Sequence, residues 1–127
     1  MNNIVIKIVP EQIYYPAVNF NYQTGICEIS GETYMEDTYR FYEPLINWLR
    51  DYTLTKRPIL FNFKLIYFNT SSSRFVLEIL DILKAYQSAN GKVDICWFYK
   101  TDDPDILAEI NDFSAEVGIE IKTIPFD

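Results

Sequence analysis

Several residue types that carry protein chemistry are absent from this sequence or scarce in it. It contains no histidine, so the commonest general base and the commonest metal ligand are both missing. The two cysteines, Cys27 and Cys96, are far apart in apolar, strand-like segments, which predicts buried reduced thiols and argues against zinc. The four glycines are scattered and cannot form a phosphate-binding loop. We therefore expect no metal site and no cofactor, and only carboxylate-based catalysis stays open.

Basic residues are few as well. The chain has 11 Lys and Arg against 18 Asp and Glu, a net charge of −7, and the bases form no run. A negative surface repels nucleic acid and anionic lipid, so we expect neither as a partner. No apolar stretch approaches the roughly 20 residues that span a bilayer, and the first residues do not resemble a signal peptide. These absences predict a cytoplasmic protein that does not enter a membrane.

What is present predicts one compact domain over residues 1–127. The length is that of an ordinary domain, and 49% hydrophobic residues are enough to fill one core. Aromatic residues make up 17% of the chain, more than one core of this size needs. Some of them are therefore expected on a surface that binds another protein.

The spacing of apolar residues predicts strands early in the chain and between helices. Residues 15–20 and 26–29 flank a polar connection that ends in glycine, which is typical of an antiparallel hairpin. In the strand predicted over residues 59–68, one alternating face consists of Phe61, Phe63, Leu65 and Tyr67. Further strands are predicted over residues 4–8, 93–99 and 120–124.

Three segments show helical spacing instead. The first covers residues 37–52, where Pro44 predicts either a kink or a helix that begins only near Glu43. The second begins after Asn69 and ends at Asn90-Gly91, and the third begins at Asp103-Pro104. Such alternation of strands and helices predicts an α/β fold with a mixed, mostly parallel sheet, an N-terminal antiparallel hairpin and about three helices.

The segment Asn69-Thr70-Ser71-Ser72-Ser73 lies where a strand ends and a helix begins. In open parallel sheets this edge carries function, and the first amides of the helix have no partner inside it. One interpretation is structural, with Thr70 or Ser71 capping the helix. The other is regulatory. A phosphate on one of these hydroxyls would lie at the positive end of the helix dipole and would place about −2 charge where a partner packs.

Acidic residues are concentrated near the C-terminus. Asp105, Glu109, Asp112 and Glu116 have the spacing of one helical face. A solvated outer face is the simpler interpretation, and a docking surface for a basic partner is the alternative.

Four stretches together resemble the SiaC family of bacterial regulatory phosphoproteins. They are residues 29–34, 41–49, 63–73 and 93–99, the last followed by Asp102-Asp103. The most specific part is the Tyr-Phe-Asn-Thr-Ser-Ser stretch at 67–72. Met35 stands where the family often has proline, and we expect it to lie away from the site.

This resemblance implies a fold similar to STAS domains, the anti-sigma-factor antagonists, and a partner-switching function. It implies phosphorylation of Thr70, with Ser71 as the alternative and with Asn69, Ser72 and Ser73 as surroundings that bind partners. The implied partners are a GHKL-type serine/threonine kinase, a PP2C-type phosphatase and an effector such as a diguanylate cyclase, in cyclic-di-GMP signalling and biofilm formation. The implied protein has no enzymatic activity of its own.

Two other functions remain open from the sequence. The chain could be an interaction domain whose affinity does not depend on phosphorylation, with the serine run only capping a helix. It could instead be an enzyme that uses carboxylates such as Glu32 and Asp103, which requires a pocket where these acids converge.

Overall fold

The computed structural model describes residues 1–127, and its six strands form one sheet in the order β1-β2-β3-β4-β5-β6. β1 pairs with β2 and β2 with β3 in antiparallel fashion, whereas the pairs β3–β4, β4–β5 and β5–β6 are parallel. The mixed sheet and its antiparallel start are therefore as predicted. The strands are β1 (Ile4–Ile6), β2 (Ala17–Asn21), β3 (Ile26–Thr33), β4 (Ile59–Phe68), β5 (Val93–Lys100) and β6 (Lys122–Phe126).

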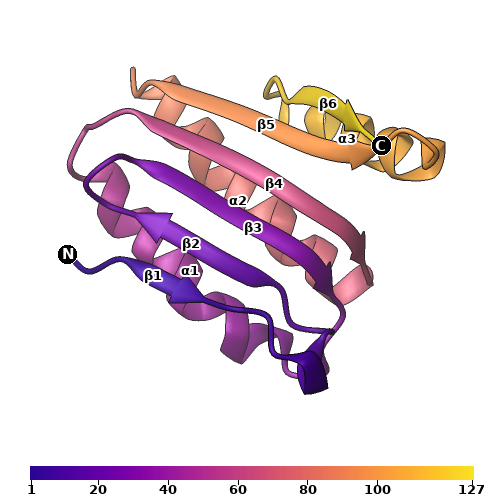
Figure 1. Cartoon of the computed structure of the whole chain (residues 1–127). Coiled ribbons are helices and arrows are strands. Elements are labelled where there is room, and N and C mark those ends of the chain that lie inside the picture. The colour runs from indigo at the N-terminus through magenta and orange to yellow at the C-terminus, as the bar shows by residue number, and fades with distance from the viewer.

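Three α-helices connect the parallel strands and cover one face of the sheet. Figure 1 shows all three on the same side, with the other side free of helices. Consecutive crossovers of one hand place their helices on one face when the strands follow in chain order. The helices are α1 (Thr38–Thr53), α2 (Thr70–Ser88) and α3 (Pro104–Val117), and a short 3-10 helix, η1 (Pro10–Gln12), joins β1 to β2.

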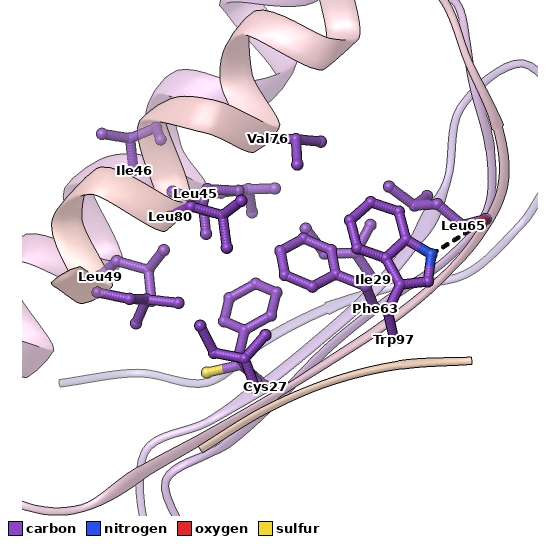
Figure 2. Close-up of a cluster of buried hydrophobic side chains, with 14 of the residues drawn as sticks. Cys27, Ile29, Leu45, Ile46, Leu49, Phe63, Leu65, Val76, Leu80 and Trp97 are labelled. Carbon is purple, nitrogen blue, oxygen red and sulfur yellow. Dashed lines mark hydrogen bonds between the residues drawn. The ribbon is translucent and has the colours of Figure 1, made fainter. Parts of the chain in front are cut away.

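The hydrophobic core fills the space between the sheet and the helices (Figure 2). On the sheet side Phe63 and Trp97 stack with ring centroids 4.5 Å apart, and the Trp97 indole donates to the Leu65 carbonyl over 3.3 Å. From the helices, Leu49 of α1 and Leu80 of α2 are fully buried in the same core. This packing holds α1 and α2 against the sheet.

The end of β4 differs from the predicted alternation. The β3–β4 register shifts between Gly31 and Glu32, so that Gly31 pairs with Leu65 but Glu32 pairs with Tyr67. The additional β4 residue reverses the alternation. As a result Tyr67 is half exposed, and Phe68 packs on the core instead. Bulges of this kind bend a strand and are frequent beside functional sites.

Two other boundaries also differ from the predictions. α1 runs unbroken through Pro44, so a helix that begins only near Glu43 is wrong. β6 begins at Lys122, two residues later than predicted. The alternation at 119–121 has another cause, because Ile119 and Ile121 are buried in the connection from α3.

Candidate functional site

The candidate site is the first turn of α2, at the carboxyl end of β4. Asn69 has extended backbone, its side-chain Oδ1 accepts from the Ser72 amide over 2.9 Å, and its carbonyl accepts from the Ser73 amide over 2.9 Å. Asn69 is therefore the N-cap of α2. The prediction that Thr70 or Ser71 caps this helix is wrong, because a cap needs the extended backbone that precedes the first helical residue.

Thr70 is the first residue of α2, and both Thr70 and Ser71 are exposed. Neither hydroxyl is engaged in capping, since Asn69 does that work. The amides of Thr70 and Ser71 have no acceptor inside the helix, because intrahelical donation begins only after the first turn. An exposed hydroxyl therefore lies beside two free amide donors at the positive end of a 19-residue helix.

The next two serines have different surroundings. Ser72 is fully buried, and its Oγ lies 2.8 Å from the Thr33 Oγ1, so it supports the site from inside and does not face a partner. The Ser73 hydroxyl donates to the Thr70 carbonyl over 2.7 Å. Of the four residues with hydroxyls in this turn, Thr70 and Ser71 are exposed, Ser73 is partly buried and Ser72 is buried.

A buried hydrogen-bond chain holds the start of α2 in place. Thr33 Oγ1 lies 2.8 Å from the Tyr42 hydroxyl and 2.8 Å from Ser72 Oγ, so that β3, α1 and α2 meet at one threonine. Burial raises the pKa of Tyr42, while its hydrogen bond with Thr33 lowers it, and the hydroxyl stays protonated at neutral pH. Sequence reasoning missed Thr33 and Tyr42, since their partners lie 9 and 39 residues away and leave no local pattern.

Met35 also lies close to the site, contrary to the prediction. Its Sδ accepts a weak hydrogen bond of 3.8 Å from the same Thr33 hydroxyl. Met35 is 2% exposed and forms part of the lining of a surface hollow of about 510 Å³ at this end of the sheet. Met35, the position that departs from the family pattern, is therefore linked to Ser72 of α2 through the side chain of Thr33.

The carboxylates proposed for catalysis do not converge in that hollow. Its lining includes neither Glu32 nor Asp103. Asp103 is the N-cap of α3 and accepts from the Ile106 amide over 3.1 Å. No group of three or more Cys, Asp or Glu side chains lies close enough together to hold a metal ion.

The four acids of α3 are all exposed and form its outer face, as the simpler interpretation of their spacing predicted. Partial burial raises the pKa of Glu109, and the charges of Asp103, Asp105 and Asp112 raise it further.

None of the helices has the length and apolarity that a membrane span needs.

Comparison with known proteins gives the family. The model of the family described as "SiaC family regulatory phosphoprotein" matches residues 9–126. The chain belongs to the SiaC family. An uncharacterized protein of Pseudomonas aeruginosa (strain UCBPP-PA14) is 29% identical over 85 residues, which cover 66% of this chain and 68% of the relative.

Solved SiaC structures from Pseudomonas aeruginosa share the fold. One SiaC structure superposes with a TM-score of 0.88 at 24% identity and covers 99% of this chain and 100% of the other. Apo-SiaC gives a TM-score of 0.85 at 22% identity, with 98% and 99% covered. A third structure holds SiaC as the activator in complex with the diguanylate cyclase SiaD, with a TM-score of 0.85 at 24% identity and 93% and 98% covered.

Proposed function

We propose that this SiaC-family chain is a partner-switching regulator controlled by reversible phosphorylation of Thr70. A GHKL-type kinase adds the phosphate and a PP2C-type phosphatase removes it. The unmodified protein binds and regulates an effector such as a diguanylate cyclase, in the cytoplasm, and has no catalytic activity of its own. The complex between SiaC and SiaD supports a cyclase as the class of effector to test first.

The observation that carries the proposal is the exposed, uncommitted Thr70 hydroxyl at the first position of α2. Because Asn69 is the cap, the helix does not need Thr70 for its own stability. A phosphate here would be stabilised by the free amides and the helix dipole, and the fold would change little. A partner that packs on this turn would have to bury a dianion, which is very unfavourable without a counter-ion. Binding would then be lost while the fold remains.

The first test is phosphorylation of the intact chain by a GHKL-type kinase and ATP, followed by intact-mass spectrometry. We expect one added phosphate on the wild type and on Ser71→Ala, and none on Thr70→Ala. Ser71→Ala is the matched control, because it removes the neighbouring exposed hydroxyl from the same turn. Full labelling of Thr70→Ala would exclude Thr70 as the modified residue.

The second test is effector binding before and after modification. We expect a diguanylate cyclase to bind the unmodified chain and to be released by the phosphorylated one, with Thr70→Glu showing a partial effect because one carboxylate carries less charge than a phosphate. Equal affinity for both forms would favour the alternative, an interaction domain that does not depend on phosphorylation.

A further inference from the structure

A tyrosine-lined hollow lies at the same end of the sheet as Thr70. The segment after η1 and the connection from β3 to α1 meet there and enclose about 510 Å³. Figure 1 shows η1 at the end of the sheet where β3 and β4 finish. The tyrosine hollow, as we call it, is lined by Tyr14, Tyr15, Tyr34, Met35, Glu36 and Asp37.

The walls of the tyrosine hollow are held in place by the fold. The Tyr34 amide donates to the Tyr14 carbonyl over 3.0 Å, which ties the two sides together through the backbone. The Tyr14 ring centroid lies 5.1 Å from that of Tyr15 and 6.0 Å from that of Tyr34. Met35 is anchored because the Thr38 hydroxyl donates to its carbonyl over 3.2 Å. The hollow therefore exists before any ligand binds, which lowers the entropy cost of binding.

The electrostatics of the tyrosine hollow select for positive charge. Tyrosine rings present negative faces that attract cations. Two exposed carboxylates, Glu36 and Asp37, lie in the lining. Asp37 pairs with Arg40 over 3.4 Å, but both side chains are more than half exposed, so that pair is weak, and Glu36 forms no ion pair. An anionic ligand would be repelled both by these acids and by the net charge of −7.

Direct contacts connect the lining of the tyrosine hollow to the start of α2, where the proposed phosphorylation site lies. Tyr34 contacts Tyr67 edge to face, with ring centroids 5.4 Å apart, and Tyr67 is two residues before the cap of α2. The Asn69 amide donates to the Thr33 carbonyl over 3.3 Å, one residue before Tyr34. A partner segment that reaches into the hollow would therefore lie over the surface that includes Thr70.

We propose that the tyrosine hollow binds a cationic side chain, arginine or lysine, from a peptide segment of the partner that covers Thr70. This inference rests on the proposed function, since it supplies an anchor for the partner that phosphorylation releases. The aromatic walls take the apolar stem and the face of the cation, and the carboxylates of Glu36 and Asp37 neutralise its charge.

The test uses the full chain and a short capped peptide, Gly-Arg-Gly, with NMR chemical shifts as the readout. The control peptide carries citrulline, which has nearly the same shape as arginine without the charge. We expect saturable shifts at the residues of the tyrosine hollow with the arginine peptide and none with citrulline. Equal binding of the two peptides, or shifts confined to the acidic face of α3, would overturn the proposal.

Two pairs of variants locate the site. Tyr34→Leu should weaken peptide binding by about fivefold to tenfold, while Tyr34→Phe keeps the ring and should keep the affinity. Glu36→Gln should weaken binding by several-fold, while Glu116→Gln removes the same charge from a distant helix and should have no effect. Glu36 is exposed, so its substitution leaves the fold intact even if Tyr34→Leu does not. Unchanged affinity in Glu36→Gln and Tyr34→Leu would overturn the proposal.

This inference and the proposed function fail in different ways. Thr70→Ala should bind the arginine peptide as the wild type does, although it accepts no phosphate. If the peptide binds but Thr70→Ala is still phosphorylated, the assignment of Thr70 fails and the cation site stands. If Thr70 is phosphorylated but the peptide does not bind, the cation site alone fails.

Discussion

The side chains of Asn69 and Ser72 hold the first turn of α2 in place, and the Thr70 side chain takes no part in this. Asn69 caps α2 through the Ser72 amide, and the Ser72 hydroxyl bonds to Thr33 inside the core. This division allows Thr70 to change its chemistry without disturbing the turn that presents it.

Because these residues have different structural roles, alanine variants at Asn69, Ser71 and Ser72 should differ in their free energy of unfolding. Asn69→Ala should lower the free energy of unfolding by about 1 kcal/mol, because the cap is lost. Ser72→Ala should cost about 1 kcal/mol through its buried hydrogen bond, although Thr33 keeps its bond to Tyr42. Ser71→Ala, which is exposed, should stay within about 0.5 kcal/mol of the wild type. Urea denaturation measures all three, and an Asn69→Ala variant as stable as Ser71→Ala would contradict the cap.

At the scale of elements, α1 contains Pro44 in its interior, which lowers the stability of the helix by one hydrogen bond. Pro44 is the seventh residue of α1, is exposed, and has no amide to donate to the Arg40 carbonyl. Pro104 is the first residue of α3, where a missing amide costs nothing because no acceptor lies behind it. The same residue type is therefore unfavourable in one helix and neutral in the other.

Pro104→Ala serves as the control for Pro44→Ala in a stability measurement. Pro44→Ala should raise the free energy of unfolding by about 1–3 kcal/mol by restoring a helical hydrogen bond. Pro104→Ala should change it by less than about 0.5 kcal/mol. Thermal unfolding followed by circular dichroism measures both. Greater freedom of the unfolded chain lowers the stability of both variants, so a gain of equal size from Pro104→Ala would show that the restored helix bond is not the cause.

Element boundaries show how far sequence reasoning reaches. Apolar periodicity was sufficient to predict all three helices, and the hairpin and the mixed sheet followed from turn residues and from the alternation of elements. It failed at Tyr67, because a shift in strand register reverses the alternation and leaves no mark in the sequence. It also failed to separate Asn69 from Thr70 as the cap, since both residue types are good caps and only the backbone distinguishes them.

At the scale of the whole molecule, the site itself was predicted only in part. The turn at 69–73 could be found from its serines and its resemblance to the SiaC family. The tyrosine hollow could not, because its walls come from segments about 20 residues apart, which meet through the backbone bond and the ring contact between Tyr34 and Tyr14. The aromatic excess in the composition predicted that some aromatic residues lie on the surface but not where they lie.

Charge is also a property of the whole molecule, and it concentrates on α3. The pKa of Glu109 is raised above its ordinary value of 4.5 by burial and by three neighbouring acids. The folded state therefore holds this proton more tightly than the unfolded state. Stability must fall as the pH rises from the unfolded pKa through the folded one, and the loss is complete once the pH is well above the folded pKa.

Glu109→Gln should remove that loss. We expect its free energy of unfolding to exceed that of the wild type at pH 7 by less than about 0.5 kcal/mol, because the side chain is exposed and solvent screens it. At or below about pH 3 the two proteins should be equally stable, since the wild-type carboxyl is then protonated in both states. Denaturant titrations at the two pH values test this, with Glu11→Gln as a control for total charge. A difference that persists unchanged at low pH would argue against the charge mechanism.

The strand order has a consequence for how the protein is made. Because every strand pairs with its neighbours in sequence, no later segment has to be inserted between two that have already joined. Ribosomes synthesise about 5–20 residues per second, so the antiparallel strands β1, β2 and β3 can pair first. Each later strand, with the helix that precedes it, can then be added to the edge of this sheet. Assembly in this direction never requires two paired strands to separate again. The last strand to be added is β6.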